Sequence, residues 1–230
     1  VLYFNIMNVD EEKPQDPNRD RLVLSKGHAA PALYSVLAEK GYFDKELLKT
    51  FRKIGSDLQG HPGMKNVPGV DMTTGSLGQG ISAAVGMALA SKMDKAGCKV
   101  YCILGDGEIE EGQVWEALNT ATKYQLDNLC VILDNNNLQI DGEIEKVGGM
   151  NNITERFLSA GLNVVNIDGH NIDSIIDAFT TAKQTKGKPT VIIAKTIKGK
   201  GISSMQNKAE WHGKAPSEEE YNTAIEEQNR

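Results

Sequence analysis

Oxygen-bearing side chains follow two strand-like segments of the sequence, about thirty residues apart. Asp106 stands in Gly-Asp-Gly directly after the apolar run 100–104, and Asn136 stands in an asparagine triplet directly after the run 129–133. Carboxylate and amide oxygens are ligands that Mg²⁺ prefers. Gly107 has no side chain and could offer its N–H to a phosphate. Each motif alone is also a common turn sequence. The pair at this spacing, with a helix-like segment between, predicts a site for a metal ion and a diphosphate.

The chain has four histidines, and three of them neighbour glycine in loop-like sequence: His28, His61 and His212. Imidazole titrates near neutral pH, so these side chains can donate and accept protons in a catalysed reaction. A single loop histidine is ordinarily an exposed polar residue, but three in such contexts indicate a functional set. The fourth, His170, stands in a predicted strand-to-helix turn, and no chemical role is expected for it.

The elements that must position these residues follow from the hydrophobic pattern. Short apolar runs predict strands, and segments with helical periodicity alternate with them. The predicted strands are 100–104, 129–133, 163–167 and 190–194, and the predicted helices are 31–40, 44–53, 78–94, 113–124, 153–160 and 173–183. Alternation of this kind predicts an α/β, three-layer fold with a mostly parallel sheet and helices on both faces. Ligands of such folds bind at the carboxyl ends of the strands, where Asp106 and Asn136 lie.

Composition excludes several classes of function. Asp and Glu outnumber Lys and Arg by 31 to 25, for a formal net charge of −6, and aromatic residues make up 6%. An acidic chain with few aromatics is a poor binder of nucleic acid. No apolar run approaches the roughly 20 residues of a membrane-spanning helix. The cysteines Cys98, Cys102 and Cys130 cannot all pair and are expected to be buried thiols, which predicts a cytoplasmic protein.

We expect one diphosphate-binding domain over residues 1–230. Residues 1–20 form an opening segment that looks cut at its N-terminus, because the chain starts with Val in an apolar patch. A loop rich in glycine and proline covers 55–75. Residues 215–230 are expected to be an exposed C-terminal tail with a short helix capped by Ser217.

Residues 105–142 resemble the fingerprint of thiamine-diphosphate enzymes, in which GDG is followed about thirty residues later by paired asparagines: GDGEIEEGQVWEALNTATKYQLDNLCVILDNNNLQIDG. Four further segments resemble the amino-terminal, diphosphate-binding half of the transketolase family: RDRLVLSKGHAAPALY, the short GHP at 60–62, PGVDMTTGSLGQGISAAVGMALA and KGKGISSMQNKAEWHGK. The five motifs stand in the family's order between Arg19 and Lys214. The resemblance implies the thiamine-diphosphate-binding fold.

The resemblance also implies roles for individual residues. The ligands implied for a divalent cation (Mg²⁺, Ca²⁺ or Mn²⁺) are Asp106, Asn136 and the carbonyl of Leu138. The contacts implied for thiamine diphosphate are Gly75, Leu77, Gly107, Lys198, His28 and His212. The catalytic residues implied are His28, His61 and His212, with His61 facing the donor sugar. The acids that match a network at the family's subunit contact are Glu111 and Glu116.

Two parts of the family's pattern have no counterpart here. One is an upstream S-G-H-P-G segment that brings another active-site histidine. The other is the pyrimidine-binding domain, which supplies the glutamate that protonates the cofactor and the arginines that bind the sugar's anionic group. We therefore expect a partner, a C-terminal transketolase subunit with the pyrimidine-binding domain, in an α2β2 hetero-oligomer.

The function expected from the resemblance is that of the N-terminal subunit of a two-component transketolase, which transfers a two-carbon ketol unit from a ketose (phosphate) donor to an aldose acceptor. Three alternatives stay open: a subunit of another thiamine-diphosphate enzyme, such as a synthase that condenses a ketoacid with an aldose phosphate; a transketolase for a sulfonated or otherwise non-standard ketose; and a non-catalytic cofactor-binding or assembly protein. The histidines of SKGH and GHP favour transketolase. A dinucleotide-binding domain is excluded, because no G-x-G-x-x-G opens a helix after the first strand.

Overall fold

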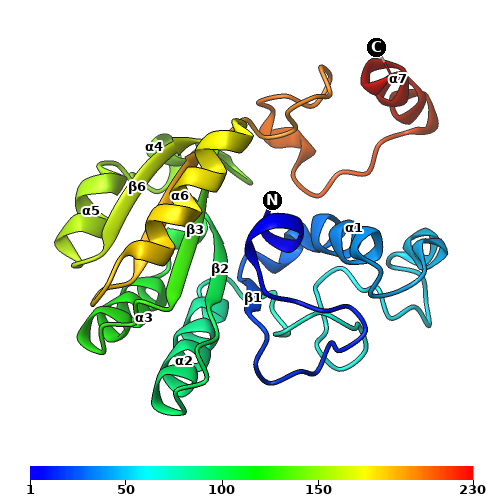
Figure 1. Ribbon diagram of the computed structural model, residues 1–230. Coiled ribbons are helices and arrows are strands. Elements are labelled where there is room, and N and C mark those ends of the chain that lie inside the picture. Colours follow the sequence, from blue (N-terminus) through cyan, green and yellow to red (C-terminus); the bar gives the residue numbers. More distant parts are fainter. Residues whose placement is uncertain (230) are drawn as a thin grey trace.

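A five-stranded, wholly parallel sheet forms the centre of the computed structural model, which describes residues 1–229 (Figure 1). Its strands, in spatial order, are β1 (Arg21–Leu24), β2 (Val100–Gly105), β3 (Leu129–Asn135), β7 (Thr190–Lys195) and β6 (Asn163–Asp168). A separate antiparallel pair is formed by β4 (Leu138–Gln139) and β5 (Gly142–Glu143). The predicted parallel sheet is confirmed, and β2 and β3 are neighbours in register, so that Gly105 pairs with Asp134.

Helices cover both faces of the sheet, as predicted (Figure 1). One face packs against α2 (Gln79–Met93), α3 (Gly112–Lys123) and α5 (Ile153–Ser159). The other packs against α1 (Ala30–Lys40) and α6 (Ile172–Gln184). The remaining helices are α4 (Ile144–Val147) and α7 (Glu218–Gln228), with a π-helix at Leu2–Ile6 and 3₁₀ helices at Gly27–Ala29, Lys45–Thr50, Glu108–Glu110 and Ala209–Trp211.

The strands are buried on both faces because successive side chains point to opposite sides of the sheet. In β3, Val131 and Leu133 belong to the core beneath α2 and α3, whereas Cys130 belongs to the core beneath α1 and α6. Two hydrophobic cores therefore hold the sheet rigidly, and its carboxyl edge is a fixed platform for the loops that follow each strand.

Local signals account for most element ends. α1 stops at Gly41, which has a φ of 100° that suits glycine. The predicted short helix after Ser217 is present as α7, with a complete capping box between Ser217 and Glu220. The predicted helix 44–53 is wrong: Asp44 does cap the turn, but only a 3₁₀ helix forms, and Arg52 then adopts a φ of 59° that ends it.

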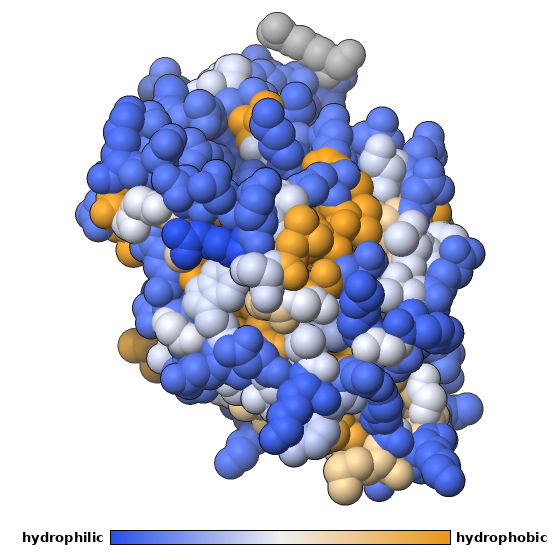
Figure 2. All heavy atoms as spheres, turned by 90° about the vertical axis from the view of Figure 1, so that its left-hand side faces the viewer, coloured by the Kyte–Doolittle hydropathy of each residue, from blue (hydrophilic) through white to orange (hydrophobic). Residues whose placement is uncertain are grey.

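The surface of the molecule is mostly hydrophilic on the face that lies to the left in Figure 1, with a hydrophobic area near its middle (Figure 2). Among residues 1–229, no helix is long and apolar enough to cross a membrane. All three cysteines are free and buried, as expected.

Candidate functional site

A cavity of about 280 Å³ opens at the carboxyl ends of β1, β2 and β3. It gathers residues that are far apart in the sequence but were all assigned to the site by resemblance. Nine of the ten predicted site residues line it: His28, Gly75, Leu77, Asp106, Gly107, Asn136, Leu138, Lys198 and His212. The tenth, His61, is outside this lining. Parallel strands end at one edge of the sheet, which is why loops from five parts of the chain meet here.

The two predicted oxygen ligands lie side by side at the ends of β2 and β3. The Asp106 carboxylate accepts the backbone N–H of Asn137 at 2.5 Å and that of Gly107 at 3.0 Å. The Asn136 side-chain oxygen accepts the N–H of Leu138 at 3.1 Å. Both side chains are buried, with exposed fractions of 2% and 9%. The Gly107 N–H, expected to face a phosphate, is engaged by Asp106 in this structure.

The donor set fits a hard divalent cation. A carboxylate, an amide oxygen and the nearby Leu138 carbonyl are all oxygen ligands, and Mg²⁺ ordinarily keeps water and phosphate oxygens beside such protein ligands. No basic side chain among residues 1–229 forms an ion pair with Asp106. Burial, with a contribution from Asp134, raises the pKa of Asp106 to about 6, because the hydrogen bonds from Asn137 and Gly107 and the charge of Lys26 compensate the carboxylate incompletely. A bound cation would supply the missing compensation.

Basic groups line the same cavity. Lys198 Nζ lies 3.5 Å from His212 Nδ1, and the His212 and His28 rings lie 5.0 Å apart between centroids. Lys26 also lines the cavity. Burial, and then the positive charge of Lys26, lowers the pKa of Lys198, although Asp134 and Asp106 oppose this effect. Two positive charges, on Lys26 and Lys198, beside two imidazole rings fit an anionic ligand such as a diphosphate.

The histidines of this cavity are held in their neutral form. Burial, followed by the charges of Lys26, His212, Lys198 and His61, lowers the pKa of His28 to about 4. Burial, followed by Lys198 and Lys26, lowers the pKa of His212. Neutral imidazole offers one donor and one acceptor, so both rings can hydrogen-bond to hydroxyl groups near neutral pH.

His61 lies beside the cavity, on the far side of the Gly75 backbone. A Cβ atom placed at Gly75 would lie 2.9 Å from Cγ of the His61 ring, and Gly75 has a φ of 149° that favours glycine. The His61 side chain is exposed. The structure thus brings His61 against the loop that lines the cavity but leaves its ring open to solvent.

Glu108 is a buried residue of this site that the sequence reasoning missed. Its carboxylate accepts the Ser25 hydroxyl at 2.5 Å, the Gly78 N–H at 3.0 Å and the Gly105 N–H at 3.1 Å. These donors belong to three cavity walls: the end of β1, the turn before α2 and the end of β2. Glu108 stands inside the GDGE motif with Gly105, but nothing in its spacing identifies the two distant donors, Ser25 and Gly78.

Lys26 and Asp134 were also missed. Lys26 Nζ lies 2.7 Å from the Asp134 carboxylate, and Asp134 accepts a further hydrogen bond from the Thr196 hydroxyl. Burial alone would raise the pKa of Asp134, but the Lys26 charge and these hydrogen bonds hold it below its usual range. The pair ties the end of β1 to the ends of β3 and β7. Lys26 stands in SKGH beside His28, which was the only available signal.

Glu111 and Glu116 do not line the cavity. Both side chains are exposed, at the N-cap and on the outer face of α3. A Cβ atom at Gly78 would lie 2.8 Å from Glu111 Cβ, so Glu111 packs closely behind the turn before α2.

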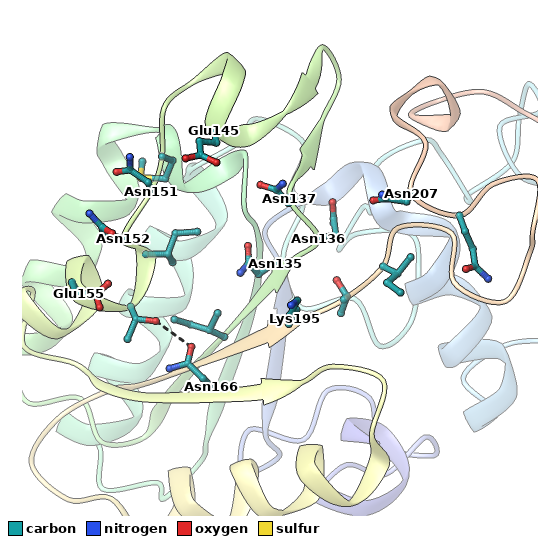
Figure 3. A pocket seen from close by; sticks show the side chains of 17 residues that line it. Asn135, Asn136, Asn137, Glu145, Asn151, Asn152, Glu155, Asn166, Lys195 and Asn207 are labelled. Atoms are coloured by element: carbon teal, nitrogen blue, oxygen red, sulfur yellow. Dashed lines mark hydrogen bonds between the residues drawn. The ribbon is translucent and has the colours of Figure 1, made fainter.

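A larger and more open hollow, of about 780 Å³, lies on the other side of Asn136 (Figure 3). Amide side chains dominate it, including Asn135, Asn151 and Asn166, and Asn166 accepts a hydrogen bond from Thr154 at 3.2 Å. It shares only Asn136 with the predicted site residues. The smaller cavity is the candidate site, because the predicted oxygen ligands and the basic groups line it together.

Comparisons with known proteins agree with this geometry. Residues 1–228 match the family model described as transketolase, thiamine diphosphate binding domain. The chain is 48% identical over 227 residues to the 6-deoxy-6-sulfo-D-fructose transketolase subunit SqwG of a Clostridium species, covering 99% of this chain and 82% of that protein. It is 44% identical to an apulose-4-phosphate transketolase subunit of Phocaeicola vulgatus, covering 99% of this chain and 80% of that protein.

Longer relatives match as well. Human transketolase is 47% identical over 215 residues, which are 93% of this chain and 34% of that protein. The crystal structure of transketolase from Campylobacter jejuni superposes with a TM-score of 0.91 at 36% identity, covering 99% of this chain and 37% of that one. The chain thus spans about a third of these longer transketolases. It belongs to the transketolase family of transferases, whose thiamine diphosphate binding domain it matches from residue 1 to residue 228.

Proposed function

We propose that this chain is the N-terminal, cofactor-anchoring subunit of a two-component transketolase that acts in the cytoplasm, with residues 1–230 as a single diphosphate-binding domain. The observation that carries the proposal is one cavity lined both by Asp106 and Asn136 and by Lys26, Lys198, His28 and His212. An oxygen-ligand pair in one cavity with two lysines and two imidazoles suits a metal–diphosphate unit.

Different residues of this chain would bind the cation, the diphosphate and the rings of the cofactor. Asp106, Asn136 and the Leu138 carbonyl would hold a divalent cation such as Mg²⁺. Lys198, His28, His212 and the backbone of Gly107 would hold the diphosphate, and Gly75 and Leu77 would line the cofactor's rings. When bound, thiamine diphosphate supplies the electron sink for cleaving and forming carbon–carbon bonds.

The histidines would act on the sugar. His28 has its pKa lowered to about 4, so its neutral ring can donate to one hydroxyl and accept from another at neutral pH. His61, exposed beside Gly75, can reach a substrate hydroxyl without touching the diphosphate. Proton exchange at these hydroxyls is the contribution of general acid–base catalysis.

A partner subunit would complete the site. The cavity of about 280 Å³ is at the lower limit of the roughly 300–1,000 Å³ of ligand pockets, as expected for one wall of a site shared between chains. Two close relatives are themselves described as transketolase subunits. Their described substrates carry a sulfonate and a phosphate, so the ketose used here is expected to carry an anionic group.

The test is reconstitution. The purified chain, a candidate partner with a pyrimidine-binding domain, and their mixture are assayed for ketol transfer with Mg²⁺ and thiamine diphosphate, using ketoses that carry phosphate or sulfonate. We expect activity only in the mixture. Activity of this chain alone, with partner contamination excluded by mass spectrometry, would overturn the two-component proposal. Failure of the chain and the mixture to bind the cofactor would overturn the proposed function itself.

A further inference from the structure

We propose that His170, the histidine with no expected role, is a positioning residue that sets the place of Lys198 in the cofactor cavity. The proposal rests on the proposed function for its biological meaning, but its structural basis is independent. His170 follows β6, the edge strand farthest from β1, and does not line the cofactor cavity. It acts through the backbone that follows β7.

The contact is a hydrogen bond from main chain to imidazole. The N–H of Ile197 donates to His170 Nε2 at 2.8 Å. An accepting Nε2 carries no proton, so the neutral ring must hold its proton on Nδ1. Lys198 is the next residue along the chain, which makes His170 an anchor one residue away from a wall of the cavity.

The turn around His170 also contacts the segment 195–197 at a second point. The N–H of Gly169 donates to the Lys195 carbonyl at 2.8 Å, and the N–H of His170 itself donates to the Asp168 carboxylate at 2.9 Å. A Cβ atom at Gly169 would lie 2.5 Å from Thr196 Cγ2, so only glycine permits this approach. The turn therefore holds the segment in place from the side of β6.

Residues at the end of β3 hold the segment 195–197 from the other side. The N–H of Thr196 donates to the Asn135 carbonyl at 3.1 Å, and the Thr196 hydroxyl donates to Asp134. The backbone of residues 195–197 is thus held by hydrogen bonds from both sides. We infer that this fixes the direction in which the side chain of Lys198 points. Lys198 Nζ then meets His212 Nδ1 at 3.5 Å, and His212 stacks near His28. A continuous line of contacts thus runs from β6 to the basic groups of the cavity.

Charged groups near His170 do not provide an alternative acceptor for Ile197. Asp168, Lys195 and Lys200 line one hollow with His170, and Lys26, Asp134 and Lys198 line another with it. The Asp168 carboxylate accepts the His170 N–H, and the Asp134 carboxylate accepts from Lys26 and Thr196. Removing the imidazole nitrogen would leave the Ile197 N–H to water, and the start of the 197–208 loop would lose its contact with β6. A purely structural residue would affect folding stability alone, whereas a positioning residue must change the environment of Lys198 and His212.

The experiment compares three variants of the full chain. His170→Leu removes the acceptor, and His170→Gln keeps an acceptor near the position of Nε2. Asn171→Ala is the control, because Asn171 caps α6 in the same turn without contacting the Lys198 segment. Histidines labelled with ¹³C and ¹⁵N are followed by NMR, which is practical for a chain with four histidines. The apparent Kd for thiamine diphosphate with Mg²⁺ is measured by calorimetry.

We expect His170→Leu to shift the His212 resonances and raise the midpoint of the His212 titration, because Lys198 no longer sits beside that ring. The Kd should rise about three- to tenfold, the scale of one lost hydrogen bond. His170→Gln should restore both readouts, and Asn171→Ala should change neither. In a Lys198→Met background, His170→Leu should cause no further loss of affinity. An unchanged His212 signal in a folded His170→Leu variant, or full additivity with Lys198→Met, would overturn the proposal.

Failure of the proposed function and failure of the His170 proposal can be told apart. If the wild-type chain and its complex bind no thiamine diphosphate, the proposed function fails, while the His212 signal still tests the role of His170. If His170→Leu does not fold, the ¹⁵N shifts of wild-type His170 decide: a proton on Nδ1 with a bare Nε2 supports the proposal, and the opposite tautomer contradicts it.

Discussion

Asp106 is a buried carboxylate that carries most of the metal assignment. Its oxygens accept two backbone N–H groups but no cationic partner among residues 1–229, and burial raises its pKa to about 6. Such a group is costly to keep ionised unless a cation joins it. The chemistry of the residue thus points to a ligand rather than to stability.

Asp106→Ala should abolish Mg²⁺-dependent binding of thiamine diphosphate. Folding should change little, by about 1 kcal/mol, because the lost hydrogen bonds are offset by removal of a poorly compensated buried charge. Calorimetry measures binding, and urea denaturation measures stability. Asp177→Ala, an exposed carboxylate on α6, is the control and should bind normally. Unchanged affinity in Asp106→Ala would refute the metal assignment.

His61 should act on substrate and not on the cofactor. Its exposed ring lies beyond Gly75 and outside the cavity lining. His61→Ala should leave the cofactor Kd within about threefold and lower the rate of the reconstituted enzyme by roughly 10²-fold or more, the scale of a lost acid–base contact. Steady-state kinetics and calorimetry on the same preparation measure the two effects. An equal loss of cofactor affinity would contradict this division.

At the scale of elements, the cavity depends on how three loops are joined. The end of β1 pairs with β2, and the Ser25 N–H donates to the Ile103 carbonyl, but the turn before α2 lies outside this strand pairing. Glu108 joins them by accepting from Ser25, Gly78 and Gly105. A single carboxylate can do this because it has several lone pairs and all three donors are within reach.

Glu108→Ala should therefore destabilise the chain and disorder the cavity. Leaving three buried donors unpaired should lower the free energy of unfolding by about 3 kcal/mol, at roughly 1 kcal/mol or more each. Urea denaturation measures the change. Glu39→Ala removes only an exposed ion pair with Lys45 and should change stability by about 0.5 kcal/mol or less. A Glu108→Ala variant as stable as Glu39→Ala would show that the three loops are held by other contacts.

For the whole molecule, the outer face of α2 is an available surface for a partner. Gly86 and Ala90 are exposed there, whereas Ile81, Ala84 and Ala88 pack on the sheet. Large apolar side chains are also exposed elsewhere, Ile54 and Met93 among them. Small residues let another helix approach closely, and burial of exposed apolar side chains against a partner stabilises the complex. This surface supports association with a partner, for which an assembly with two copies of each subunit is our prediction.

Gly86→Lys should prevent that assembly without harming the fold. A Cβ atom at Gly86 has no neighbour within 4 Å, and lysine has the higher helix propensity. Native mass spectrometry of the mixture should show a 2:2 complex for the wild type and separate chains for Gly86→Lys. Thr180→Lys, on the exposed face of α6, should assemble normally. A 2:2 complex of Gly86→Lys would exclude this helix face from the interface.

The sequence alone determined the class of fold and predicted most of the residues that line the candidate site. Strand and helix periods are local properties, so strands 100–104, 129–133, 163–167 and 190–194 and most helices were predicted to within a few residues. The metal and histidine motifs are also local. Nine of the ten residues assigned by motif do meet in one cavity.

Only the tertiary structure decided which distant residues contact and support the residues of the candidate site. β1 has only four residues, and its pattern is too weak to identify it as a strand without its partner β2. At 44–53 only a 3₁₀ helix forms, over Lys45–Thr50, and Arg52 beyond it has a left-handed φ of 59°. Glu108, Lys26 and His170 each have a partner 27 to 108 positions away: Gly78, Asp134 and Ile197. Such contacts depend on parallel strands placing their loops at one edge of the sheet, and the spacing of residues along the chain does not encode that closeness.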